Sequence, residues 1–180
     1  MKPITLACLI CCFAIASLSW LGCGFGPPDK ITNLADYPST LQEWSSTGLV
    51  AHFPASVPPQ AQNVRFSALP GYLQGGAHLQ LRMQLPADEV AAIEARLAMA
   101  TTHVYDGGGV YDHYNKDQDN NWPTTSFHTA DNPRTSSDFP THYKLYVLSA
   151  TNRGSWNHGK TTGAAISTKL NEVIYWADSW

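Results

Sequence analysis

Cysteine is missing from most of this chain. All 4 cysteines of the 180 residues lie near the amino terminus, and Cys23 is the last of them. The part of the chain that follows therefore holds no disulfide framework and no cysteine-ligated metal. It must fold around a hydrophobic core, and a single domain of this length can bury one.

Charge is scarce as well. Charged residues make up 14% of the chain, and 11 basic residues against 14 acidic ones give a formal net charge of −3. The basic residues are scattered along the sequence and form no stripe. This pattern argues against binding to nucleic acid and against electrostatic attraction to anionic lipid.

The amino-terminal segment has no charge between Lys2 and Asp29. One basic residue followed by an apolar run over residues 4–21 is typical of an export signal or a membrane anchor. In one interpretation, Leu21-Gly22 before Cys23 resembles the lipobox of a bacterial lipoprotein signal, although Trp20 stands where leucine is usual.

Two other interpretations of this segment stay open. They are ordinary cleavage after Ala16 and an uncleaved membrane helix, since the run is long enough to span a bilayer. We favour the lipoprotein signal, which predicts a diacylated Cys23 and a domain held at the membrane outside the cytoplasm. It divides the chain into a signal segment, a tether and one domain, at residues 1–22, 23–30 and 31–180.

The clearest structural pattern is an alternation over residues 77–85. The apolar side of this predicted strand carries Leu79, Leu81, Met83 and Leu85, and the polar side carries His78, Gln80, Arg82 and Gln84. We expect the first side to be buried and the second to face solvent. A weaker strand at residues 64–68 and a glycine-rich turn at residues 70–76 complete an antiparallel hairpin.

A helix is predicted directly after this hairpin. Pro86 suits the first helical position, and Asp88 and Glu89 suit the positive end of the helix dipole. Val90, Ile93 and Leu97 then recur at helical spacing and form an apolar stripe. We expect this stripe to pack on the apolar face of the hairpin.

The remaining elements are weaker. The patterns predict a short helix at 40–45 capped by Ser39, strands at 48–53 and 143–148, and a second hairpin from strands at 163–168 and 172–176. Residues 106–142 predict a long polar loop that aromatic side chains pin to the domain. The fold class is therefore α+β, an antiparallel sheet of two hairpins and a further strand with one main helix on one face.

Two segments together resemble a known family. One runs from His52-Phe53-Pro54 to Pro70 and on through Leu73-Gln74-Gly75-Gly76, and the other contains Asn157-His158-Gly159, Ala165-Ile166-Ser167 and Asn171-Glu172-Val173-Ile174-Tyr175-Trp176. This is similar to a family of small, uncharacterised bacterial exported proteins, often predicted to be lipoproteins. The resemblance covers most of the mature chain, supports an envelope location and implies no catalytic residues.

Candidate chemistry is sparse. A hydrolase would use His158 with Asp112 or His113, if the fold brings them together. The series Asn115, Asp117, Asp119 and Asn121 has the spacing of a calcium loop, but Asn120 replaces the required glycine and Ser126 the closing glutamate. We therefore expect no metal and no other cofactor.

A binding role is the leading functional hypothesis. Tyr111, Tyr114 and Trp122 in the long loop are the candidate contacts, and the partner is an envelope protein or a small ligand, with the membrane reached through the amino-terminal lipid or anchor. The hydrolase and a purely structural envelope component are the alternatives. Because no complete catalytic motif is present, we favour a protein that is not an enzyme.

Overall fold

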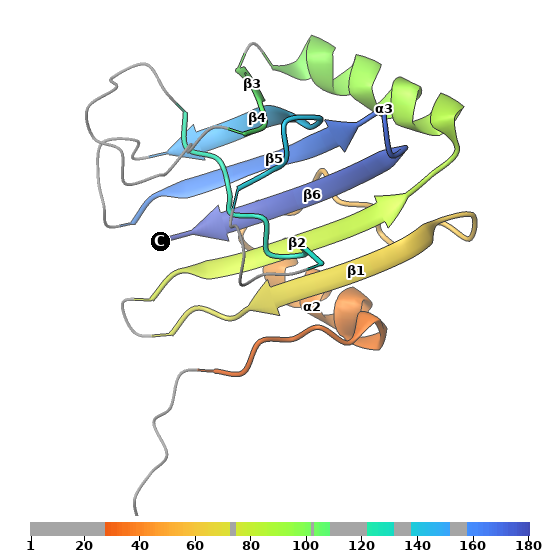
Figure 1. Ribbon diagram of the computed structural model, residues 1–180. Helices are drawn as coiled ribbons and strands as arrows, with labels where there is room; N and C mark the ends of the chain where they lie inside the picture. The colour runs from red at the N-terminus through yellow and green to blue at the C-terminus, as the bar shows by residue number, and fades with distance from the viewer. Residues whose placement is uncertain (1–27, 73–74, 102, 109–121, 132–137, 152–157) are drawn as a thin grey trace, which may run out of the picture.

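The computed structural model describes residues 28–72, 75–101, 103–108, 122–131, 138–151 and 158–180. Its elements follow in the order η1 (Leu34–Asp36), α2 (Tyr37–Ser45), β1 (Gln62–Leu69), β2 (Ala77–Gln84), α3 (Ala87–Ala100), β3 (Val104–Asp106), β4 (Lys144–Thr151), β5 (Lys160–Ser167) and β6 (Glu172–Ser179). The strands form one antiparallel sheet in the order β1-β2-β6-β5-β4-β3 (Figure 1). The predicted α+β class is confirmed.

Both predicted hairpins are present, and β6 joins them. β1 pairs with β2, and β5 pairs with β6. β6 also pairs with β2 along its whole length, from Ala77 opposite Ser179 to Gln84 opposite Glu172. β4 is the predicted further strand, and β3 is a short edge strand that the sequence pattern does not indicate.

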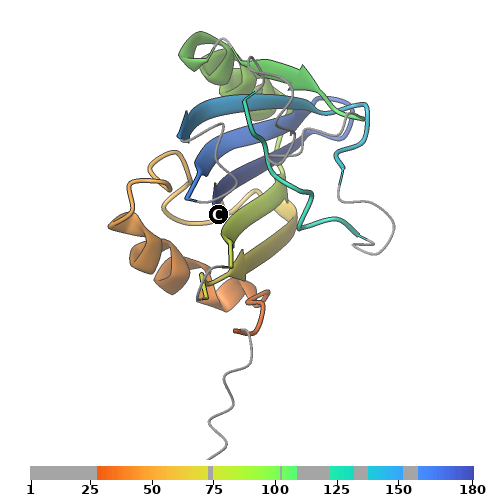
Figure 2. The same cartoon turned by 90° about the vertical axis from the view of Figure 1, so that its left-hand side faces the viewer.

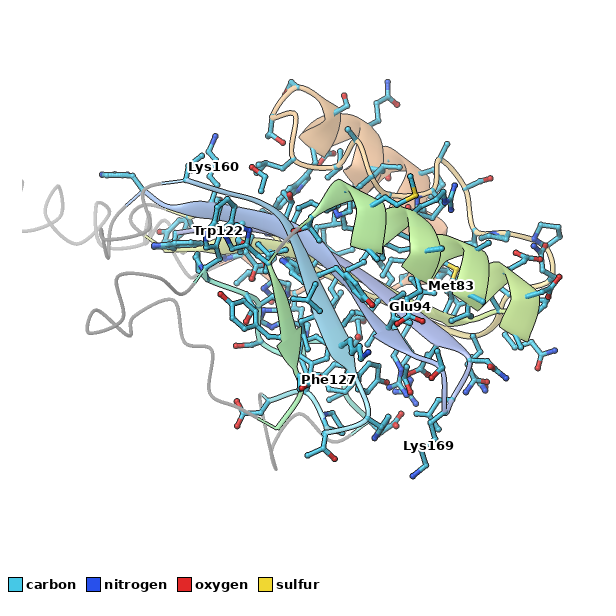
Figure 3. The ribbon with its side chains drawn as sticks, turned by 90° about the horizontal axis from the view of Figure 1, so that it is seen from above. Met83, Glu94, Trp122, Phe127, Lys160 and Lys169 are labelled. Carbon is cyan, nitrogen blue, oxygen red and sulfur yellow. The ribbon has the colours of Figure 1, made fainter. Side chains whose placement is uncertain are left out.

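One face of the sheet carries the main apolar core. The apolar side chains of β2 are buried there with the predicted stripe of α3 and with Tyr37 and Phe53 from the region of α2. Tyr146 of β4 donates a hydrogen bond to Glu94 of α3 at 2.7 Å, which also holds this helix to the outer strands (Figure 3). The prediction of one main helix packed on one face is confirmed.

The opposite face is not the solvent-facing surface that the alternation predicts. Gln80 is 0% exposed and Arg82 is 9% exposed. Residues 122–131, here called the strap, lie across this face, on the side away from α2 (Figures 1 and 2). The prediction fails because the strap brings polar groups that pair with the polar side chains of β2, so these side chains can be buried without loss of hydrogen bonds.

Two local predictions are also wrong. Residues 48–53 form turns instead of a strand, and Gly48 has a φ of 72° just after α2, where glycine ends helices readily. α2 begins at Tyr37, so Ser39 lies inside the helix and donates to the carbonyl of Asp36 at 2.9 Å instead of capping it. Part of the predicted loop at 106–142 is pinned by aromatics as expected, because Phe127 and Phe139 are buried.

Candidate binding site: the strap and the arginine cleft

The strap is held by side chains from four neighbouring strands. Thr161 of β5 donates to the carbonyl of Pro123 at 2.8 Å, and Thr125 hydrogen-bonds Asp178 of β6. On β2, Gln80 and Arg82 contact the middle and the end of the strap. On β1, Arg65 forms an ion pair with Asp131. In Figure 3, Trp122 lies toward the Lys160 end of β5, and Phe127 lies farther along the sheet.

Gln80 makes the densest of these contacts. Its amide nitrogen donates to the carbonyl of Ser126 at 3.1 Å, and its amide oxygen accepts from the backbone N–H and the hydroxyl of Thr129 at 2.9 and 2.8 Å. One primary amide therefore pairs with the strap backbone in both directions, much as a neighbouring strand would. This bonding explains how a glutamine can be fully buried in the sheet.

Next to Gln80 lies a buried ionic cluster. Arg82 Nε lies 2.9 Å from Glu172 Oε1, and the guanidinium lies 5.4 Å from the ring centroid of Phe127. Arg82 Nη1 also donates to the carbonyl of Thr129 at 3.2 Å. The hydroxyl of Tyr143 donates to Glu172 Oε2. Burial alone would lower the pKa of Arg82, but contact with Glu172 outweighs it and the pKa is raised, so the guanidinium stays charged.

Arg82 and Arg65 converge on the carboxylate of Asp131. Arg65 Nη2 lies 2.5 Å from Oδ1, and Arg82 Nη1 lies 3.5 Å from Oδ2. The Asp131 side chain is 67% exposed and that of Arg82 only 10%. The three residues border a hollow of about 620 Å³, here called the arginine cleft, which is also lined by Asn63, Val64, Gln84, Leu170 and Glu172.

A second hollow, of about 360 Å³, adjoins the first. It shares Val64, Arg65 and Asp131 with the arginine cleft and extends past Lys30 and Leu34 of the segment before α2. The Arg65–Asp131 ion pair therefore lies between two open spaces. The ammonium group of Lys30, at the edge of the second hollow, donates to the carbonyl of His128 at 3.1 Å.

A cluster at the other end of β2 has the composition of a hydrolase triad. Ser67 Oγ lies 2.9 Å from His78 Nε2, and Asp178 is the cross-strand partner of His78. The His78 ring stacks on His128 with centroids 3.6 Å apart. Burial and then the charges of His128 and Lys30 lower the pKa of His78 to about 3.

This cluster does not fit nucleophilic catalysis. A general base works best when its pKa is near the operating pH, so a histidine with a pKa of about 3 is too weak to activate a serine. Ser67 is also 1% exposed and cannot reach a substrate without movement of the strap. Burial raises the pKa of Asp178 to about 7, which favours a neutral acid beside the histidine pair. The cluster therefore stabilises the strap.

Two of the residues predicted from sequence are described by the structure. His158 is exposed and adopts a φ of 66° just before β5. Trp122 begins the strap, stacks on His103 with ring centroids 3.8 Å apart, and its backbone N–H donates to the Tyr105 hydroxyl at 2.6 Å. The remaining predicted positions lie outside the described residues: Cys23, Tyr111, Asp112, His113 and Tyr114.

The sequence patterns do not predict the residues of the arginine cleft as a functional site. Arg65 and Arg82 are cross-strand partners in the β1–β2 hairpin. That register is the signal that could have found them, because cross-strand partners share one face of a sheet. Asp131 gives no such signal, since no local pattern places the strap on β1.

Neither a protein-family model nor a curated protein nor a solved structure matches this chain. Among the described residues, none of the helices combines the length and the apolar character that crossing a membrane requires. The same part of the chain contains no group of three or more histidine, cysteine or acidic side chains that could hold a metal ion.

Proposed function

We propose that this chain is an exported, membrane-tethered binding module and that the arginine cleft is its recognition site. The uncharged leader that ends at Cys23 supports export and lipid attachment. The observation that carries the binding role is the pair of guanidiniums that meet one exposed carboxylate at the wall of an open hollow. Guanidinium groups bind planar anions through directed hydrogen bonds.

The strongest support for binding is that one arginine is held firmly in place and the other is exposed. Arg82 is fixed by Glu172, by the carbonyl of Thr129 and by the ring of Phe127, so its guanidinium is preorganised at the cleft wall. Arg65 is 51% exposed and can adapt to a ligand. A hollow of this volume lies in the range of small-molecule sites.

Site-specific crosslinking in intact cells tests the proposal. A photo-crosslinking amino acid in place of Leu170, on the cleft wall, should give a discrete crosslinked species. The same probe in place of Met99, which is 89% exposed on α3, is the control and should not give it. Arg65→Glu should abolish the Leu170 product. Equal products at both positions, or a Leu170 product that survives Arg65→Glu, would overturn the cleft as the recognition site.

A further inference from the structure

Asp131 occupies the arginine cleft in the way that a ligand group would. Its two carboxylate oxygens are divided between Arg65 and Arg82, at 2.5 and 3.5 Å, while most of its side chain remains in contact with solvent. An exposed ion pair contributes little stability, since water solvates the separated charges well. We infer, on the basis of the proposed function, that the natural ligand presents a carboxylate that replaces Asp131 between these two guanidiniums.

The fixed charges of the cleft select a single negative charge. When Asp131 leaves, the charged groups that the described residues contribute to the lining are Arg65, Arg82 and Glu172, and their sum is one positive charge. A carboxylate restores neutrality. A phosphate dianion would overshoot it and would lie near the buried carboxylate of Glu172, where repulsion is poorly screened. The ligand class is therefore a carboxylate.

The space around the ion pair can hold a ligand larger than a free anion. Hollows of about 620 and 360 Å³ open on the two sides of Arg65, and both include Val64. Leu170 borders the larger one and Leu34 the smaller one, and both leucines are 37% exposed. A carboxylate on an extended chain can place apolar atoms along these side chains. Such a group belongs to a small organic acid or to an acidic residue of a peptide.

Calorimetric titration of the full chain in detergent, at constant ionic strength, tests this inference. The probes are butyrate, which carries one negative charge, a capped pentapeptide with a central glutamate, and inorganic phosphate. We expect butyrate or the peptide to bind more tightly than phosphate. Butyrate binding alone would assign the ligand to small acids, and a clear preference for the peptide would assign it to acidic peptides. Phosphate binding that equals or exceeds carboxylate binding would overturn the inference.

Two variants separate ligand exchange from general charge effects. Asp131→Asn removes the internal competitor and should tighten carboxylate binding about tenfold, whereas Arg65→Gln should weaken it about tenfold, the usual scale of one charged contact. Asp88→Asn and Arg96→Gln change the same charges on exposed positions of α3 and should leave affinity unchanged. Asp131 and Arg65 are both more than half exposed, and a thermal melt of each variant verifies that it folds.

The outcomes also separate this inference from the proposed function. If Asp131→Asn binds carboxylates no better than Asp88→Asn, the exchange is wrong. If that result accompanies an intact Leu170 crosslink, the cleft still binds a partner and only the carboxylate assignment falls. If the Leu170 crosslink is absent as well, the recognition role of the cleft falls with it.

Discussion

Several individual polar residues of the sheet are buried in this fold. Gln80, Arg82, Glu172 and Asp178 are each less than 10% exposed, yet they are not part of the apolar core. Each has a partner in the strap or in the cluster that holds it. A buried polar group is costly to leave unpaired, so these residues tie the stability of the sheet to the position of the strap.

The first prediction concerns Gln80. Gln80→Ala leaves the backbone N–H of Thr129 buried without its acceptor and removes two further hydrogen bonds. We expect a loss of about 3 kcal/mol in the free energy of unfolding. Urea unfolding measures it, with Gln42→Ala on the exposed side of α2 as the control. Similar values for the two variants would show that the strap bonds do not stabilise the domain.

The second prediction concerns Asp178 and pH. Burial raises the pKa of this carboxyl to about 7 in the folded state, against an ordinary value of 3.8. Between these values the unfolded chain releases the proton and the folded chain keeps it, so this group lowers stability as pH rises from about 4 to 7. Three pKa units correspond to roughly 4 kcal/mol.

Asp178→Asn removes this titration and should become more stable relative to the wild type as pH rises from about 4 to 7. The difference between the two proteins isolates Asp178, because the buried histidines act equally in both. His78 acts in the opposite direction: its lowered pKa makes stability fall as pH drops below its ordinary value of 6.5. Urea unfolding of both proteins across this range measures the difference. A difference that does not change with pH would contradict the buried, neutral carboxyl.

At the scale of elements, β5 and β6 depend on close backbone packing. A Cβ atom at Gly163 of β5 would lie 2.2 Å from the carbonyl oxygen of Tyr146 and 2.3 Å from the Trp176 ring. The carbonyl of Gly163 also lies 3.0 Å from Nε2 of His52, which belongs to the turn after α2. The centre of the sheet therefore has no room for a larger residue here.

The third prediction follows from this contact. Gly163→Ala should cost about 3 kcal/mol, because the clash involves a backbone carbonyl that cannot rotate away. Gly71→Ala is the matched control, since its Cβ would meet only the Ala77 side chain, at 3.5 Å. Thermal melts of the two variants compare them. If Gly163→Ala has the same melting temperature as the wild type, the backbones of β4, β5 and β6 leave room for a Cβ atom and this prediction is wrong.

Elements with a regular period are the ones that the sequence predicts well. β2 alternates with period two and α3 repeats its apolar stripe at helical spacing, so each reveals its buried side without knowledge of the fold. The strap has no period. Its contacts join residues far apart, such as Gln80 and Thr129, which are 49 positions apart, and many of them use backbone groups that all residues share.

The same limit applies to the candidate site. His158 and the aromatic residues are predicted as site residues because their residue types are chemically distinctive. The arginine cleft depends instead on register between β1 and β2 and on the docking of Asp131, which is 66 positions from Arg65 in the chain. Residue type alone cannot separate such an arginine from an ordinary surface charge. The polar face of β2 is wrongly predicted to face solvent for the same reason, because the strap that buries it is distant in the sequence.

At the scale of the whole molecule, the last prediction concerns attachment to the membrane. Cys23 follows Leu21-Gly22 and an apolar run, and Ile31, a few residues further along the chain, is bridged to Ala68 of β1. Two acyl chains on Cys23 would hold the domain stably at a bilayer. Cys23→Ser should therefore leave the precursor unprocessed and unlabelled by a clickable fatty acid, whereas Cys12→Ser, within the apolar run, should be processed and labelled normally. Intact mass spectrometry reads the mature terminus directly, and a start at Ser17 or at Met1 would favour ordinary cleavage or an uncleaved anchor instead.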